Sequence, residues 1–388
     1  MRINEDWLTD RPTQTALRLL EDAGHQAFVV GGCVRNALLG VPVADIDIAT
    51  SAHPETVIEL AGAEGLKAVP TGIAHGTVTI VADQVPFEVT TFRRDVETDG
   101  RRSVVAFTYA LEEDARRRDF TINAIYADAD GAVLDPLGGL PDLTARRVRF
   151  IEDANLRIRE DYLRSLRFFR FHAQYGDPDA GLDTEALDAI AGNLDGLETL
   201  PGERIGAEMR KLLEAADPAP ALAAMETTGA LSRILPGAST TFIAPLVHLE
   251  GEASQPPEFI RRMVALGGGE PTTRLRLSRA EEKPRRILIR AIESGATPAE
   301  IAWRFGAKTA WSAVLVQHAM AGSPLVADIA IAIEAGASAE FPVSANDLMP
   351  KLQGADIGSA LQELERAWID SDFALTHSEL LELRANEG

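Results

Sequence analysis

The sequence predicts an α/β or α+β domain over about the first 140 residues, followed by an elongated array of helices. Two observations lead to this fold class. Short runs rich in β-branched and aromatic residues, punctuated by Gly, Pro or Asp, are concentrated before Pro136. Beyond Pro136, apolar residues recur at three- and four-residue spacing between Gly and Pro. The 388 residues are enough for two or three domains with substantial cores.

Four strands and two helices are expected in the N-terminal domain. The predicted strands are AFVVGG at 27–32, DIDIAT at 45–50, TVTIV at 77–81 and PFEVTTF at 86–92. The predicted helices cover 34–40 and 54–62. Pro54 suits the first turn of the second helix, because a missing N–H costs nothing there.

The remainder of the chain is expected to be helical, without an internal repeat of fixed period. The predicted helices cover 155–175, 183–194, 201–215, 220–228, 274–294, 298–305 and 358–369. Between 237 and 272 the pattern is irregular, and we predict no element there.

The charge distribution limits where a polyanion could bind. With 38 basic and 59 acidic side chains the formal net charge is −21, which at first sight argues against nucleic acid. Residues 141–175 nevertheless carry eight Arg against five acids, and residues 274–290 are comparably basic. Only a regional electropositive surface is therefore expected.

Composition also indicates the compartment. A single cysteine, Cys33, rules out an internal disulfide framework and a cysteine-clustered zinc site, and it fits a reducing environment. The first ten residues contain three acids and no apolar core, unlike a secretory signal. No uncharged apolar run approaches the ~20 residues that span a bilayer. We expect a soluble cytoplasmic protein without a membrane partner, and its oligomeric state does not follow from the sequence.

Three acidic residues of two predicted strands could form a cluster. By strand alternation Asp45 and Asp47 share one face, and Glu88 lies opposite its apolar neighbours. If these strands pair, the three carboxylates meet, and two like charges ~4 Å apart repel by roughly 4 kcal/mol at a dielectric of ~20. Such a cluster needs protons or cations, and all-oxygen ligands suit Mg²⁺. On this pattern alone, solvated acids at a strand end remain an alternative.

A Gly-Gly turn lies just upstream, in GGCVRNALLG at 31–40. Glycine allows close backbone approach to a ligand, and a helix N-terminus attracts phosphate. The pattern is neither G-x-G-x-x-G nor a Walker A loop, so a dinucleotide-binding fold or a P-loop ATPase is disfavoured. An ordinary strand-to-helix turn remains open.

These motifs continue in a recognisable order. After G-G-x-V-R-x-x-L-L-G and D-x-D come RRDFTINA at 117–124, DPLGG at 135–139, EDYLR at 160–164 and a helical segment at 203–213. Together they resemble the signature of class II tRNA nucleotidyltransferases, the CCA-adding enzymes, and of bacterial poly(A) polymerases. The resemblance covers roughly half of the chain.

The resemblance implies an α+β nucleotidyltransferase head of the polymerase-β type with a mixed sheet, at residues 1–140. A helical neck with a nucleotide-selecting motif would cover 141–215, and a helical body and tail that bind tRNA would cover 216–388. Asp45, Asp47 and Glu88 would be the catalytic carboxylates, with Asp45 and Asp47 holding two Mg²⁺ ions.

It also assigns nine nucleotide-binding residues. By resemblance, Gly32 and Arg35 would contact the triphosphate, and Arg118, Asp119 and Asn123 would act near the ribose and phosphates. Asp161 and Arg164 would read the base edge, and Arg167 and Arg170 would complete the pocket.

The base-reading assignment has a physical rationale of its own. On one continuous helix, positions 161, 164 and 167 fall near one face. An Asp acceptor beside an Arg donor can pair with the amino group and ring acceptor that cytosine and adenine share. Uracil and guanine would leave these charges unpaired, at a cost of ~1–3 kcal/mol each. Ordinary salt bridges on a solvated helix remain the alternative.

The implied reaction adds C, C and A to the 3′ end of tRNA from CTP and ATP, releasing pyrophosphate by a two-metal displacement. TGIAHGTV at 71–78 resembles the CCA-adding branch, and residues 92–107 resemble the flexible loop of enzymes that perform the final A addition. A poly(A) polymerase or an A-adding enzyme is the alternative. A non-catalytic RNA-binding protein is another, although it predicts loss of a carboxylate that this sequence keeps.

Two features depart from the family or its relatives. Asn36 stands where the family commonly has Asp, which could alter the orientation of Arg35. No His-Asp dipeptide occurs, so the phosphohydrolase domain of some relatives is not expected.

Overall fold

The computed structural model describes residues 1–98, 103–349 and 352–386. They form two compact units. The first comprises Met1–Ala238 with Gly269–Arg276, and the second comprises Ser239–Gly268 with Leu277–Gly388. Both predicted domain boundaries, near residues 140 and 215, fall inside the first unit, and the division into head, neck and body stays a prediction.

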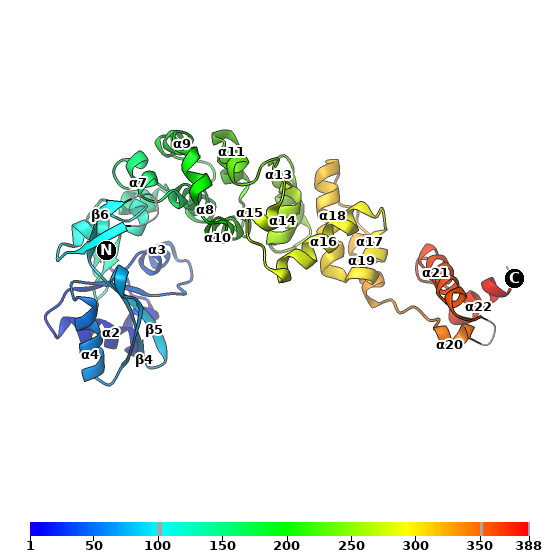
Figure 1. Cartoon of the computed structure of the whole chain (residues 1–388), viewed down its shortest axis with the longest axis horizontal. Helices are drawn as coiled ribbons and strands as arrows, with labels where there is room; N and C mark the ends of the chain where they lie inside the picture. The colour runs from blue at the N-terminus through cyan, green and yellow to red at the C-terminus, as the bar shows by residue number, and fades with distance from the viewer. Residues whose placement is uncertain (99–102, 350–351, 387–388) are drawn as a thin grey trace. The chain divides into compact units, whose positions relative to one another are not determined.

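A mixed seven-stranded sheet forms the N-terminal part of the first unit, as predicted (Figure 1). Its strand order is β3-β4-β5-β2-β1-β8-β9, and only the β2–β5 pair is parallel. The strands are β1 (Ala27–Val30), β2 (Asp47–Thr50), β3 (Lys67–Gly72), β4 (Thr77–Ala82), β5 (Val85–Thr91), β8 (Tyr126–Ala127) and β9 (Val133–Leu134).

All four predicted strands are present, and three others lacked a clear signal. β3 contains Pro70, which is tolerated because β3 is an edge strand. β8 and β9 are two residues long, too short for a periodic pattern. A separate antiparallel hairpin, β6 (Arg93–Thr98) and β7 (Ser103–Phe107), occupies the segment that resembles the flexible loop, and its residues 99–102 lie outside the described residues.

Helices pack against the sheet and connect its strands. These are α1 (Asp6–Thr9), α2 (Arg11–Glu21), α3 (Gly32–Leu39), α4 (Pro54–Ala63), α5 (Leu111–Arg116) and α6 (Leu140–Thr144), with 3₁₀ turns η1 (Ile73–His75) and η2 (Thr121–Asn123). α2 and α4 cover one face, over strands β4 and β5 (Figure 1). The buried side chains of Phe87 and Val89 come from β5.

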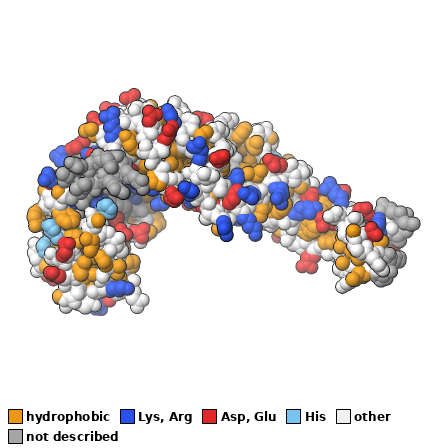
Figure 2. Space-filling model, viewed as in Figure 1, with side chains coloured by type: hydrophobic (Ala, Val, Ile, Leu, Met, Phe, Trp, Pro, Cys, Tyr) orange, Lys and Arg blue, Asp and Glu red, His pale blue; other side chains and the backbone are white. Residues whose placement is uncertain are grey.

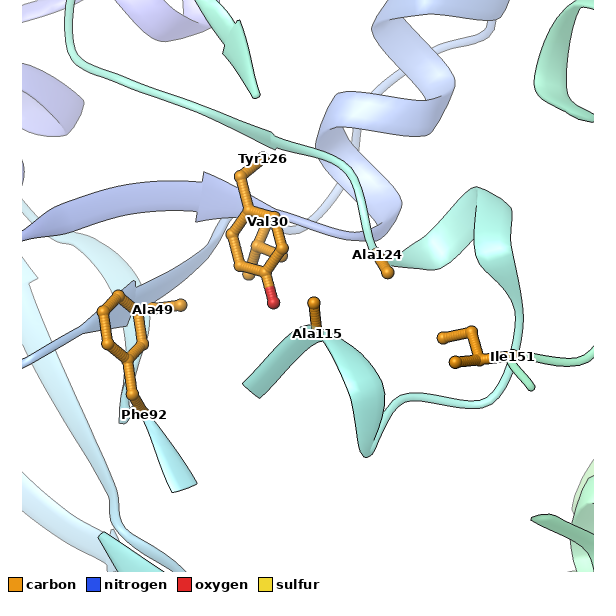
Figure 3. Packing of buried hydrophobic residues seen from close by; sticks show 7 residues of the cluster. All are labelled: Val30, Ala49, Phe92, Ala115, Ala124, Tyr126 and Ile151. Atoms are coloured by element: carbon orange, nitrogen blue, oxygen red, sulfur yellow. The ribbon is translucent and has the colours of Figure 1, made fainter. Parts of the chain in front are cut away.

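A buried cluster joins β1, β2 and β8 to α5. Figure 3 shows its members, which are Val30, Ala49, Phe92, Ala115, Ala124, Tyr126 and Ile151. Tyr126 is fully buried, and its hydroxyl points toward Ala115 on α5 (Figure 3). A buried hydroxyl needs a hydrogen-bond partner, and Asp114, the residue before Ala115, supplies it.

Helices make up most of the rest of the first unit. They are α7 (Ala154–Glu160), α8 (Leu163–Tyr175), α9 (Thr184–Ala191), η3 (Leu194–Thr199), α10 (Gly202–Leu213), α11 (Ala219–Thr228), α12 (Ala230–Ile234) and α15 (Pro271–Arg274). α10 lies directly against the segment after α15, because a Cβ on Gly206 would come within 2.0 Å of the Leu275 carbonyl oxygen.

The prediction of one continuous helix over 155–175 is wrong. α7 ends at Glu160, and Asp161 has extended backbone angles, φ −153° and ψ 105°. The Asp161 Oδ1 atom accepts the Leu163 N–H at 3.1 Å, which satisfies an unpaired amide at the start of α8. Tyr162 also packs tightly on Gly196, where a Cβ would lie 2.0 Å from its ring. Asp161 therefore shares no helix face with Arg164 and Arg167.

The second unit is helical throughout its described secondary structure. Its helices are α13 (Ile243–Glu252), α14 (Phe259–Leu266), α16 (Arg279–Glu293), α17 (Pro298–Phe305), α18 (Ala307–Ala321), α19 (Ile329–Ser338), α20 (Ala345–Leu348), α21 (Ala355–Asp370) and α22 (His377–Asn386). The predicted helix at 274–294 is divided, because Ser278 and Glu281 form a capping box that starts α16. Within the part of the chain described, no helix has the length and apolarity to cross a bilayer.

Candidate functional site

Two of the three predicted catalytic carboxylates lie on neighbouring strands. β2 and β5 run parallel, with Asp47 opposite Glu88. Phe87 and Val89 are buried, so strand alternation turns the Glu88 side chain to the opposite, exposed face. The predicted pairing of the strand that carries Asp47 with the strand that carries Glu88 is confirmed.

Asp45 lies outside the sheet, so the predicted start of this strand at residue 45 is wrong. Asp47 pairs with Val30, the last residue of β1, and the chain then turns at Gly31 into α3. On the β1 side no strand residue remains to pair with Asp45. Alternation therefore does not fix the direction of Asp45, although its negative charge contributes to the raised pKa of Asp47.

The carboxylates form a partial donor set for a divalent cation. The pKa of Asp47 is raised, first by desolvation and then by the negative charge of Glu88. Across the described residues, no three His, Cys, Asp or Glu side chains gather closely enough to hold a metal ion by themselves. Mg²⁺ needs only one or two carboxylates when water and phosphate oxygens complete its shell, so the residues present fit this ion.

The Gly-Gly turn places Arg35 in the lining of a cavity that Asp47 also lines. Gly31 has φ +73° and ψ −117°, a conformation that other residues rarely adopt, and α3 begins at Gly32. Arg35 is 5% exposed and donates hydrogen bonds to Asn123 Oδ1 at 2.5 Å and to the Tyr175 hydroxyl at 2.8 Å. Its guanidinium also lies 3.9 Å from the centroid of the Tyr175 ring.

Arg35 lacks a carboxylate partner within the described part of the chain. Its hydrogen-bond acceptors are the neutral groups of Asn123, Tyr175 and Asn36, whose Oδ1 accepts from Nη2 at 2.8 Å. Burial lowers the pKa of Arg35, since desolvation disfavours the charged form. A buried cation with only neutral partners favours an anionic ligand. With Asn at position 36, Arg35 has no carboxylate in direct contact, although the nearby charge of Asp119 favours its charged form.

Both arginines of the RRDFTINA segment form ion pairs with Asp114. Arg118 contacts Asp114 at 3.1 Å, and its Nε donates to the Tyr126 hydroxyl at 3.1 Å. Burial by itself raises the pKa of Asp114, but the charges of Arg118 and Arg117 lower it to about 2. Asp114 and Tyr126, which the sequence analysis did not single out, therefore hold the Arg118 guanidinium in place.

Asp119 links this segment to α8. It accepts hydrogen bonds from Asn123 Nδ2 at 2.9 Å and from Arg167 Nε at 2.7 Å. Although burial raises the pKa of Asp119, the Arg167 charge and the Asn123 hydrogen bond lower it to about 2. Arg170 pairs with the buried Glu208 of α10 at 2.5 Å.

Both residues of the predicted base-reading pair, Asp161 and Arg164, are held in place by hydrogen bonds. Asp161 Oδ2 accepts from Arg204 Nη2 at 2.7 Å. Arg164 donates to the carbonyl oxygens of Arg157 and Arg117, each at 2.9 Å, and to the Glu160 carboxylate. Arg204 belongs to the helical motif at 203–213, but the sequence did not reveal that it contacts Asp161.

One cavity of about 470 Å³ joins these residues. All nine residues predicted to bind the nucleotide line it, together with Asp47. The other lining residues are Gly31, Arg117, Leu163, Phe171 and Arg204. Asp45 and Glu88 do not line it. Seven arginines against three aspartates give the cavity an excess of positive charge that suits a polyphosphate.

Comparison with known proteins agrees with these motifs. The model of the poly(A) polymerase head domain matches residues 27–149, and that of a probable RNA- and SrmB-binding site of polymerase A matches residues 181–241. The chain is 42% identical over 231 residues to the CCA-adding enzyme of Geobacillus thermodenitrificans, covering 58% of this chain and 55% of the relative. Over its first half the chain is therefore similar to CCA-adding enzymes and to the head domain of poly(A) polymerases.

A second relative and a solved structure show a similar extent of likeness. The mitochondrial CCA tRNA nucleotidyltransferase 1 of Homo sapiens is 44% identical over 190 residues, which are 49% of this chain and 44% of the relative. The chain thus spans about half the length of the curated relatives it matches. The crystal structure of the Bacillus stearothermophilus CCA-adding enzyme in complex with CTP matches 97% of this chain and 98% of its own, with 28% identity and a TM-score of 0.69.

The fold extends further than the sequence similarity. The Thermotoga maritima CCA-adding enzyme complexed with tRNA matches all of this chain and 99% of its own, with a TM-score of 0.72 at 18% identity. At this identity the likeness concerns the fold alone. The family's sequence motifs lie in the first unit, in which the cavity also lies.

Proposed function

We propose that this chain adds C, C and A to the 3′ end of tRNA, using CTP and ATP and releasing pyrophosphate. One observation carries the proposal: a cavity lined by seven arginines lies beside the paired strands that bear Asp47 and Glu88. The B. stearothermophilus relative in complex with CTP and the T. maritima relative complexed with tRNA support the choice of substrates. We also place the chain in the cytoplasm, where its one buried thiol, Cys33, stays reduced.

The carboxylates have the role of metal ligands in this proposal. Asp45 and Asp47 hold Mg²⁺, with Glu88 as the third carboxylate, and the bound ion supplies Lewis-acid stabilisation of the reacting oxygens. The negative charge of Glu88 lies next to Asp47, so a bound cation would relieve the repulsion between these carboxylates. Held by these residues, the ion would lie next to the reacting oxygens of the tRNA 3′-hydroxyl and the α-phosphate.

The arginines bind and orient the triphosphate. Arg35 has neutral partners only, so a phosphate oxygen gives it its first full counter-charge. Arg118 donates from the fixed position that Asp114 and Tyr126 define. A cation held in place before the substrate binds loses less side-chain entropy on binding than a mobile one.

Base selection falls to Asp161 and Arg164, as the resemblance implies. The Asp161 carboxylate accepts from the exocyclic amino group of cytosine or adenine, and Arg164 donates to the adjacent ring acceptor. Uracil and guanine present the opposite pattern and leave these groups unpaired, at ~1–3 kcal/mol each. Arg204 holds Asp161 in this orientation, while Glu160 and two carbonyl oxygens hold Arg164.

A primer-extension assay tests the proposal. tRNA lacking its 3′ CCA is incubated with the protein, Mg²⁺ and each nucleoside triphosphate, alone and in combination. Ordered incorporation of C, C and then A is expected. Addition of a single A only to tRNA ending in CC identifies an A-adding enzyme, long A tails identify a poly(A) polymerase, and no incorporation favours a non-catalytic RNA-binding protein.

The Asp161→Ala substitution tests base selection. It is expected to reduce discrimination against UTP and GTP by about tenfold, since one hydrogen-bonding group of the selective pair is lost. The matched control is Asp183→Ala, because Asp183 also caps a helix start, through the Ala186 N–H, but does not line the cavity. Unchanged discrimination in Asp161→Ala contradicts the assigned role.

A further inference from the structure

Two aromatic residues of α8 lie among the arginines of the cavity. Phe171 and Tyr175 are one helical turn apart, and their ring centroids are 5.5 Å from each other. Phe171 is 4% exposed and lines the cavity, whereas Tyr175 is half-buried and lies behind the lining residues. Tyr175 ends α8, and the chain leaves the helix at Gly176, where a Cβ would come within 2.5 Å of His172 Nδ1. Both rings therefore hold defined places at the end of this helix.

Three guanidinium groups surround the Phe171 ring. The central guanidinium carbons of Arg35, Arg167 and Arg170 lie 5.2, 5.1 and 4.3 Å from its centroid. These distances are within the ~6 Å at which an aromatic ring attracts a cation. All three arginines line the cavity and belong to the residues that we expect to bind the nucleotide. One ring thus contacts three of the expected nucleotide ligands at once.

The carboxylates of this network are fewer than its arginines. Asp119 binds Arg167 at 2.6 Å. Glu208 binds Arg170 at 2.5 Å. Among the described residues, Arg35 has no carboxylate in direct contact, and burial lowers its pKa, as does the charge of Arg170. The Arg35 charge is therefore held beside other cations without an ion-pair partner of its own.

The aromatic rings attract Arg35 without neutralising it. Its guanidinium carbon lies 3.9 Å from the Tyr175 centroid, and its Nη2 donates to the Tyr175 hydroxyl at 2.8 Å. A carboxylate here would form an ion pair that a phosphate must break, whereas a ring leaves the full charge available. Figure 2 shows a different arrangement over the helices labelled in Figure 1, where Lys and Arg side chains are interspersed with Asp and Glu.

We propose that Phe171 and Tyr175 are positioning residues that hold Arg35 in place for the triphosphate of the incoming nucleotide. The proposal rests on the proposed function, in which Arg35 contacts that triphosphate. The rings set the position of the cation before the substrate binds, so less side-chain entropy is lost on binding. No hydrogen bond or cation–π contact of the described residues links these rings to Asp161 or Arg164. Base selection should therefore not depend on them.

A set of variants at the two rings tests the proposal. Tyr175→Phe keeps the ring and removes the hydroxyl, Tyr175→Leu removes both, and Phe171→Leu removes the central ring. The matched control is Phe169→Leu, at a fully buried residue of the same helix that packs on Phe168 and does not line the cavity. Urea unfolding, steady-state kinetics with CTP and UTP, and calorimetric binding of inorganic triphosphate are measured for each full-length protein.

The expected loss is graded and concerns the triphosphate alone. The KM for CTP should rise about threefold in Tyr175→Phe and about tenfold in Tyr175→Leu and Phe171→Leu, with kcat within about twofold of the parent. The Kd for inorganic triphosphate should rise by similar factors, because this probe has no base. The preference for CTP over UTP should stay as in the parent. Phe169→Leu should lose stability without a change in KM or Kd.

A double-mutant cycle shows whether the rings act through Arg35. In an Arg35→Gln background, Tyr175→Leu should weaken triphosphate binding no further, because the cation that the ring holds is absent. Fully additive losses would overturn the proposal. It is also overturned if the ring variants raise the KM no more than Phe169→Leu does, or if they reduce the preference for CTP as strongly as they raise the KM. Should the Leu variants fail to fold, Tyr175→Phe decides by the same measurements.

The outcomes separate this proposal from the proposed function. If the parent protein incorporates no nucleotide but binds inorganic triphosphate with an affinity that depends on Tyr175, the proposed function fails and the positioning role stands. If C, C and A are added normally and every ring variant binds triphosphate like the parent, only the positioning role fails.

Discussion

Among the described residues, each unit buries a network of charged side chains; that of the first unit lines the cavity of the candidate site, whereas that of the second is almost fully enclosed. In the first unit, Asp119 and its partner Arg167 line the cavity. In the second, Glu250 is 3% exposed and binds Arg261 at 2.7 Å and Arg262 at 2.6 Å. Charges at a cavity can exchange partners with a ligand, whereas these enclosed charges hold α14 to α13 and, through the hydrogen bond from Arg261 to Ser312, to α18.

The largest expected effect is a loss of activity without a loss of stability when a carboxylate beside the cavity is neutralised. Asp47→Asn should reduce the rate of CMP incorporation at least about a thousandfold, because several kcal/mol of charge stabilisation depend on metal binding. Its stability should be unchanged or slightly higher, since repulsion from Glu88 is removed. Rapid-quench kinetics and urea unfolding measure the two quantities. Asp83→Asn, an exposed residue of the same domain, is the control.

The enclosed network should behave in the opposite way. Glu250→Gln is expected to destabilise the second unit by about 3 kcal/mol, because Arg261 and Arg262 lose their buried counter-charge. The rate at saturating substrates should remain near that of the parent. Urea denaturation measures the stability, with the exposed Glu252→Gln as the control. A large loss of rate without destabilisation would contradict the difference proposed between the cavity network and the enclosed network.

Acid should weaken the first unit through its cavity network. The pKa values of Asp114 and Asp119 are each lowered to about 2, so the unfolded state binds more protons as the pH falls below about 4. Each carboxylate thus contributes about 2 kcal/mol that is present above pH 4 and lost by about pH 2. The free energy of unfolding, measured against pH, should fall less steeply in Asp114→Asn than in the parent.

The smallest effect concerns the support of Arg118. Tyr126→Phe removes the hydroxyl that donates to Asp114 and accepts from Arg118, while their direct ion pair remains. The KM for CTP and ATP should rise about fivefold with little change in kcat, since one hydrogen bond is worth about 1 kcal/mol. Tyr109→Phe, at an exposed tyrosine, is the control for the measured KM. An equal KM in both variants would show that Asp114 alone positions Arg118.

The sequence by itself determined the strands that carry strong alternation and the glycine turn before α3, and through its ordered motifs it indicated nine of the residues that line the cavity. Such features depend on local periodicity and on motif order, which a single chain records directly. Residues 298–305 illustrate this, because Pro298 and the apolar spacing predicted the observed bounds of α17.

Only the tertiary structure decided which residues meet. Alternation fixed the face of Glu88, but the parallel register with Asp47, 41 residues earlier, is a property of sheet pairing. The break at Asp161 and the contacts of Arg204 and Tyr126 likewise arise from packing between distant segments. A periodic pattern states which way a side chain faces and cannot name its partner, because the partner is chosen by the fold as a whole.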